Sequence, residues 1–292
     1  YHYSVKLAEE IELIPCGIGT HKSSIDLYRE GKVDHITTVD SAPTENRIQL
    51  SHEFDDASLH STMDIRMSAI TFTERGVKEF SLNERLALGK AIKTIIAPKF
   101  LSKPGNQDKT QFLAPFGDGQ LSKNQQDEIE KKIKEIPVKK SGKGFELSLF
   151  RHFPLDVFKE HLEKALPGIN VNQGNKLPAF SNYKSLSEIP HAFVSSGDIA
   201  FNEDISLITY AINAGLFGMD KDEQTRWIKE YMSIMDKSER LDKLQKLHFN
   251  ALKNGIIYPL VSSPYIAVVR KPWVSHLPQI FANNPLWTIS KN

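Results

Sequence analysis

Cysteine is almost absent from this chain: Cys16 is the only one among 292 residues. A single cysteine excludes an internal disulfide and any metal site that is built from several cysteines. This usage fits a reducing compartment, and it equally fits a large exported protein whose core is stable without disulfides. The cysteine count therefore leaves the compartment open.

The chain also lacks an excess of charge and a long apolar run. Its formal net charge is +1, so it has neither the basic surface of a nucleic-acid-binding segment nor a polybasic patch for a membrane. No apolar run approaches the ~18 residues that a bilayer-spanning helix needs. The chain begins with Tyr1 and shows no signal-peptide pattern, so we expect a mature product or a fragment of a longer chain.

Catalytic and cofactor-binding motifs are lacking as well. There is no Gly-x-Ser-x-Gly or His-Glu-x-x-His sequence, and Cys16 has no flanking pattern of a nucleophile. The ten histidines are scattered without the spacing of metal ligands. In the basic turn 139–144, Phe145 stands where a phosphate-binding loop needs Ser or Thr. We therefore expect no enzyme, no cofactor and no metal site.

What is present is a succession of strand-like and helix-like segments. Strands are expected at 8–15, 33–36, 63–72, 145–150, 169–171, 192–194, 256–261 and 265–269. Helices are expected at 21–31, 82–96, 124–136, 155–166, 222–235 and 237–254, and Pro98 is expected to end the second of these. The polar stretch 41–61 is expected to be a connector. The segments 8–36 and 145–171 are two strand–helix–strand units, the building block of a parallel sheet.

The stretch 191–215 carries the main candidate site. Apolar residues 192–194 predict a buried strand, which we expect to break at Ser195 into a polar turn before a helix begins. Open α/β sheets bind ligands at such strand-to-helix turns. The expected ligand-binding residues of this turn are Ser196, Asp198, Phe201, Asn202 and Glu203. As an alternative, Asn202 or Asp204 simply caps the helix.

Taken in order, four segments resemble one protein family. They are HKSSIDLYREGKVDHI at 21–36, RLALGKAI at 85–92, IAFNEDISL at 199–207 and IIYPLVSSPYIAVVRKPWVSHL at 256–277. Together they resemble the extracytoplasmic solute-binding proteins of the oligopeptide, dipeptide and nickel ABC-transporter family. The resemblance covers nearly the whole chain, but only the C-terminal portion of what is normally a longer protein.

The resemblance implies an α/β fold of the periplasmic-binding-protein-like (type II) class. It implies a lobe with a mixed sheet flanked by helices, plus part of a second lobe. Residues 1–60 would be part of the first lobe, 61–263 the C-terminal ligand-binding lobe, and 264–292 a tail that returns to the first lobe. The crossings at 59–63 and 263–266 would form a hinge that closes over the ligand.

The resemblance also implies partners and further site residues. The partners would be a small-molecule or short-peptide ligand, an ABC permease of the inner membrane and the missing N-terminal lobe of the same protein, in a periplasmic or other extracytoplasmic compartment. Arg66 would pair with a ligand carboxylate, or instead with the acidic turn. Phe72, Phe201 and Tyr265 are candidates for an aromatic cleft wall, with core packing as the alternative.

One position departs from the family pattern. Peptide-binding members carry an aspartate for the peptide's amino group where this chain has Ala200, and a buried ammonium needs a nearby carboxylate. Asp198 or Glu203 could take that role. As an alternative function, the same fold serves as the ligand-sensing domain of transcription regulators, which would place the chain in the cytoplasm.

Overall fold

The protein's structure, a computed structural model, describes residues 6–7, 12, 14, 22–36, 44–62, 66–103, 105–113, 119–150, 155–174, 183–198, 217–275 and 289–291. Its strands are β1 Lys6–Leu7, β2 His35–Ile36, β3 Ala57–Ser61, β4 Arg66–Phe72, β5 Gln107–Asp108, β6 Glu146–Phe150, β7 Asn170–Gly174, β8 Ala192–Asp198, β9 Ile257–Ser263, β10 Ile266–Arg270, β11 Trp273–Ser275 and β12 Ile289–Lys291. Its helices are α1 Ser24–Arg29, α2 Thr44–Glu53, α3 Glu74–Glu79, α4 Leu82–Leu101, α5 Lys123–Glu135, α6 Leu155–Ala165, the short 3₁₀ turn η2 Leu186–Glu188, α8 Lys221–Ser233 and α9 Lys237–Lys253.

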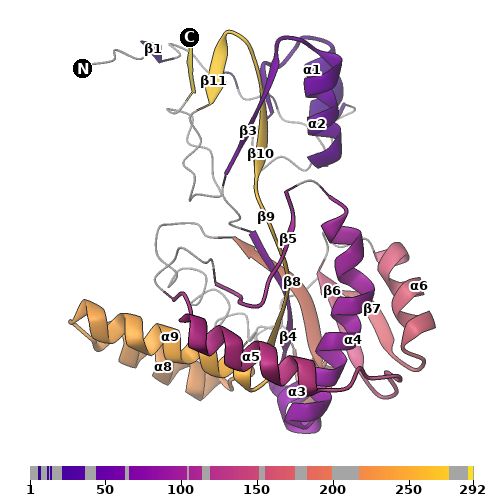
Figure 1. Cartoon of the computed structure of the whole chain (residues 1–292), viewed down its shortest axis with the longest axis vertical. Helices are drawn as coiled ribbons and strands as arrows, with labels where there is room; N and C mark the ends of the chain where they lie inside the picture. Colours follow the sequence, from indigo (N-terminus) through magenta and orange to yellow (C-terminus); the bar gives the residue numbers. More distant parts are fainter. Residues whose placement is uncertain are drawn as a thin grey trace.

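The largest sheet has six strands in the order β5-β9-β4-β8-β6-β7. Strand β4 is antiparallel to both β8 and β9, whereas β6 is parallel to β7 and β8. The predicted parallel unit at 145–171 is therefore confirmed as β6-α6-β7. A mixed sheet flanked by helices confirms the expected fold class, and Figure 1 shows this sheet in the lower part of the molecule.

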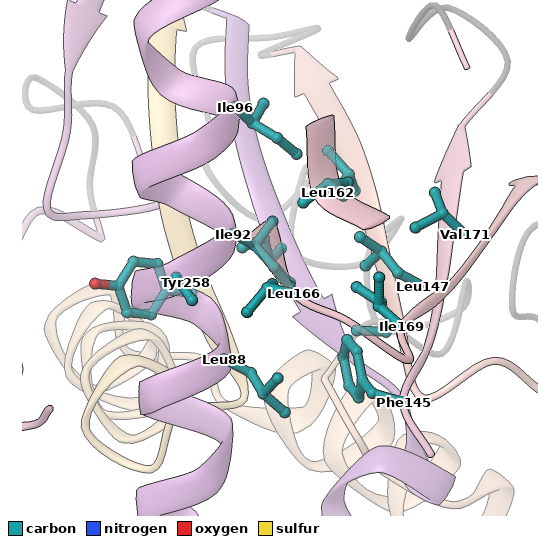
Figure 2. Packing of buried hydrophobic residues seen from close by; sticks show 14 of the residues in the cluster. Leu88, Ile92, Ile96, Phe145, Leu147, Leu162, Leu166, Ile169, Val171 and Tyr258 are labelled. Carbon is teal, nitrogen blue, oxygen red and sulfur yellow. The ribbon is translucent and has the colours of Figure 1, made fainter. Parts of the chain in front are cut away.

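One face of the six-stranded sheet packs against α4 and α6. Alternate residues of the strands, such as Ile70, Leu147 and Leu260, are fully buried in one apolar cluster with Ile92 and Leu162 from the two helices. Figure 2 shows this cluster, with Ile92 and Ile96 of α4 pointing toward the sheet and the side chains of Leu162 and Leu166 beside them. Burial of this apolar surface is the main stabilisation of the lobe.

The opposite face of the sheet packs against α8 and α9, with α5 beside them. Met67 and Ala69 of β4 lie in a second apolar cluster with Leu244 and Leu252 of α9 and Ile129 of α5. Because neighbouring residues of a strand point to opposite faces, β4 contributes to both clusters. The six-stranded sheet is thus the middle layer of three.

Helix α4 begins as the sequence predicts but ends later. The Ser81 side chain accepts a hydrogen bond from the Glu84 backbone while Glu84 bonds back to the Ser81 N–H, which is a capping box. The prediction that Pro98 ends the helix was wrong, since α4 continues to Leu101. A proline removes its own N–H bond and crowds the carbonyl four residues before it, but it does not prevent the turn that follows: the Pro98 carbonyl accepts a bond from Ser102 N at 3.1 Å.

The polar stretch 41–61 is not the connector that we expected. It contains α2 and β3, and α2 packs against the three-stranded sheet β2-β10-β3 through the fully buried Leu50. Its helix is mostly polar, so its apolar periodicity is too weak to be recognised in the sequence. Tertiary packing on β10 stabilises it instead.

The expected parallel unit at 8–36 is not found in the described residues, and most of its predicted first strand, 8–15, lies outside them. Strand β2 pairs antiparallel with β10, and β1 pairs antiparallel with β12 in a separate three-stranded sheet, β1-β12-β11. Glu12 and Ile14, the described residues within the predicted strand 8–15, are not in a strand. Strands from the far end of the chain supply the partners, which a local pattern cannot reveal. No described helix is long and apolar enough to cross a membrane.

Candidate functional site

The candidate site lies where the chain passes between the six-stranded sheet and the sheet β2-β10-β3. Two crossings make this passage, one from β3 to β4 and one from β9 to β10. In Figure 1, β9 leads directly into β10 between the lower and the upper part of the molecule. We call this region the junction and define it by Thr62, Arg66, Ser262, Ser263 and Tyr265.

Backbone hydrogen bonds tie the two crossings together. Thr62 N donates to the Tyr265 carbonyl at 2.9 Å, and Tyr265 N donates to the Thr62 side-chain oxygen at 2.9 Å. Both residues are buried. The paired bonds hold Thr62, directly after β3, beside Tyr265, directly before β10.

The structure brings together two of the predicted site residues, Arg66 and Tyr265. The Arg66 guanidinium donates a hydrogen bond to the Tyr265 hydroxyl, and its carbon lies 4.4 Å from the centre of the Tyr265 ring. A guanidinium in this position is attracted to the ring as well as to the hydroxyl. The charge of Arg66 is therefore held at the junction by an aromatic residue from the second crossing.

The end of β8 lies beside this pair, and here the sequence prediction needs a correction. The strand does not break at Ser195 but continues to Asp198, because β4 pairs with it along its whole length. Ser195 is buried and Ser196 is half-buried. In this register the backbone of Asp198 lies directly opposite Arg66, and Ser263 of β9 lies opposite Arg66 on its other side.

The other predicted site residues are either part of the core or outside the described residues. Phe72 is fully buried and packs against Phe145, with ring centres 5.8 Å apart, so it is a core residue rather than a cleft wall. Phe201, Asn202 and Glu203 lie outside the described residues, as does the helix predicted after them.

Sequence reasoning missed Thr62 and Ser262, the buried polar residues of the junction. No motif surrounds either of them in the sequence. Their role arises only because β9 and β10 return to β4 and β3 after roughly two hundred intervening residues. The sequence contains only an indirect signal for these two residues, which is that each lies within or beside a predicted crossing.

A buried histidine fixes the start of β8, at the far end of this strand from the junction. His191 Nδ1 accepts from Glu146 N at 2.9 Å, and its Nε2 bonds to a carboxylate oxygen of Glu79 at 2.8 Å. The bond from His191, supplemented by Arg75, lowers the pKa of the Glu79 carboxyl. The network is structural, and within the described residues no group of three or more His, Cys, Asp or Glu could hold a metal ion.

Comparison with known proteins shows likeness in structure but not in sequence. No family model matches the chain, and no curated protein matches it in sequence. Among solved structures, it is similar to the dipeptide-binding protein of Pseudoalteromonas sp. SM9913 in complex with Met-Leu, with a TM-score of 0.61 and 11% identity over 92% of this chain and 56% of the other.

Two further solved structures extend the comparison. The periplasmic binding protein DppA of Helicobacter pylori in complex with the peptide STSA gives a TM-score of 0.60 and 13% identity, over 91% of this chain and 54% of the other. NikA of Staphylococcus aureus with Ni(L-His)₂ gives 0.58 and 13%, over 92% and 59%. The chain spans a little over half the length of these binding proteins. It therefore has the type II periplasmic-binding-protein fold of the oligopeptide, dipeptide and nickel ABC-transporter proteins, over that part of their length.

Proposed function

We propose that this chain is part of an extracytoplasmic solute-binding protein of an ABC importer, and that it binds a small solute, peptide-like or other, at the junction. The observation that carries the proposal is the Arg66–Tyr265 pair, which places a cation and an aromatic ring where the chain passes between two sheets. Ligand sites typically combine apolar or aromatic walls with a few such polar groups, and often lie between domains.

The proposed lobes follow the sheets. Residues 61–263 form the ligand-binding lobe, while 1–60 and 264–292 belong to the other lobe, whose remainder would come from the missing N-terminal part of the same protein. In this proposal the crossings at 59–63 and 263–266 act as the hinge, which the Thr62–Tyr265 bonds support by holding the end of β3 beside the start of β10. An ABC permease of the inner membrane would receive the solute.

The chemistry of the junction indicates what kind of solute fits. A guanidinium carries five N–H donors in a planar fork that suits a carboxylate, so Arg66 is the residue of the junction that we expect to bind a carboxylate of the solute. We propose that Asp198, whose backbone lies opposite Arg66, takes the amine-binding role of the aspartate that peptide-binding members carry at position 200. We therefore expect a solute with a carboxylate, and a zwitterion such as a short peptide would satisfy both residues.

Native mass spectrometry of the purified chain, followed by denaturation, tests this proposal. We expect a small co-purified molecule that is released on unfolding, with occupancy reduced at least tenfold in Arg66→Gln, since a charge-assisted bond to a carboxylate contributes about 1.5–3 kcal/mol. Tyr265→Phe keeps the ring but loses the hydroxyl, and is expected to give an intermediate loss. Lys229→Gln, an exposed residue of α8, is the control for the loss of one positive charge.

Two results would contradict the proposal. One is equal occupancy in the wild type and Arg66→Gln. The other is a purified chain that carries no ligand and binds none from a mixture of di- and tripeptides, amino acids and nickel–histidine complexes.

A further inference from the structure

A surface groove lies between α8 and α9, away from the junction. It is an open groove of about 500 Å³ on the helical layer that covers one face of the six-stranded sheet. Small-molecule sites commonly have volumes of roughly 300–1,000 Å³. In Figure 1, α8 and α9 extend to the lower left, on the opposite end of the molecule from the upper sheets. The groove is therefore separate from the proposed solute site.

The floor of the groove is apolar. Phe217, Ala251 and Ile256 line it and belong to, or pack against, the apolar cluster under α9. Trp227 forms a half-buried wall, with its ring stacked on Tyr231 at 5.3 Å between ring centres. An aliphatic chain bound to this floor would bury its apolar surface away from water.

The two carboxylates on the rim of the groove are already engaged. Glu230 pairs with Lys243 at 2.7 Å, and the hydrogen bond from Lys243 is the main cause of the lowered pKa of the Glu230 carboxyl. Glu223 accepts a bond from Asp220 N at 3.0 Å in the capping box of α8. Because both carboxylates already have partners within the protein, we expect a ligand to bind to other polar side chains of the rim.

Two other polar side chains of the rim have no such engagement. Arg226 makes no hydrogen bond and no ion pair with the described part of the chain, and its charge contributes only a minor part of the lowered pKa of Glu230. The side-chain amide of Asn250 makes no hydrogen bond to the described residues either. An apolar floor, a tryptophan wall, a guanidinium and an amide donor thus line one groove.

We propose that this groove binds a carboxylate that carries an apolar body. The apolar body lies on the floor against Trp227, and the carboxylate accepts hydrogen bonds from the Arg226 guanidinium and the Asn250 amide. The planar fork of an arginine matches the two oxygens of a carboxylate. A medium-chain fatty acid and the C-terminus of a short apolar peptide share this chemistry.

Isothermal titration of the whole chain with sodium decanoate, and separately with N-acetyl-leucyl-leucine, tests the proposal. We expect saturable binding of at least one of them, quenching or a shift of fluorescence that is lost in Trp227→Phe, and a Kd raised about tenfold or more in Arg226→Gln. Lys229→Gln removes a positive charge from the same helix outside the groove and should leave the Kd unchanged. Binding of decanoate alone identifies the fatty acid, and binding of the peptide alone identifies the C-terminus.

Three outcomes would overturn the proposal. The first is the absence of saturable binding of both probes below the concentration at which decanoate forms micelles. The second is an equal effect of Arg226→Gln and Lys229→Gln. The third is that 1-decanol binds as tightly as decanoate, because the carboxylate would then contribute nothing to the affinity.

Discussion

His248 shows how burial determines the protonation state of a single residue. Its side chain is fully buried on α9, its Nε2 accepts bonds from Phe112 N at 3.0 Å and Leu113 N at 3.3 Å, and its Nδ1–H donates to the Gly119 carbonyl at 3.0 Å. Two backbone donors facing Nε2 require a neutral ring with its proton on Nδ1. Burial lowers the pKa of His248 to about 4, against the opposing effect of the bond to Gly119.

This histidine makes stability depend on pH in a defined direction. Between pH 6.5 and about 4 the unfolded chain binds a proton at His248 and the folded chain does not, so the free energy of unfolding falls as the pH drops. Between pH 7 and 4.5 we expect a loss of about 2 to 3 kcal/mol from this residue. Urea unfolding at both pH values should show a smaller pH dependence in His248→Gln, which does not titrate. An equal pH dependence of stability in the wild type and in His248→Gln would contradict the lowered pKa of His248.

The sequence could not single out His248 among ten histidines, because its partners are backbone groups more than a hundred residues away. Arg66 and Tyr265 are the opposite case. Both were predicted as site residues, Arg66 because it follows the first implied crossing and Tyr265 as an aromatic candidate for the cleft wall. Their mutual contact across 199 residues of chain required the tertiary structure.

At the scale of the elements, the contact between α4 and β9 depends on a glycine. A Cβ at Gly89 would lie 2.4 Å from the ring of Tyr258, which is a buried residue of β9. The helix and the strand can therefore approach each other closely only because position 89 has no side chain. Alanine is the better helix former, so helix propensity and packing act in opposite directions here.

We expect packing to dominate, and Gly89→Ala to lower the free energy of unfolding by about 1–3 kcal/mol. Thr94→Ala, at an exposed position of the same helix, is the control and should change stability by no more than about 0.5 kcal/mol. Urea unfolding of both variants provides the measurement. A stabilised Gly89→Ala variant would mean that the ring of Tyr258 moves aside at little cost.

At the scale of the whole molecule, the apolar clusters differ in size. The sheet β2-β10-β3 rests on a small cluster of buried residues around Tyr28 and Val268, whereas the six-stranded sheet has a large cluster on each face. Arg270 supplements the small cluster, with its guanidinium 4.4 Å from the centre of the Tyr28 ring and 2.7 Å from an Asp56 oxygen. The smaller cluster offers less apolar burial to resist local opening.

Hydrogen exchange should show this difference. We expect the amides of β10 to exchange by local opening, faster than the amides of β4, which should exchange only on global unfolding. Mass spectrometry of exchanged peptides that cover each strand would measure it. Equal protection of β10 and β4 would indicate instead that both sheets unfold as one cooperative unit.

The sequence alone determined the elements whose signals are local. The capped α4, the amphipathic α5, α6, α8 and α9, and the β6-α6-β7 unit follow from caps, apolar periodicity and turn residues close to each other in the chain. Only the tertiary structure decided that α2 forms in a polar stretch, that β8 continues to Asp198, and that β2 pairs with β10. These features depend on hydrogen bonds and packing between distant segments, and the junction with Arg66 and Tyr265 exists only where such segments meet.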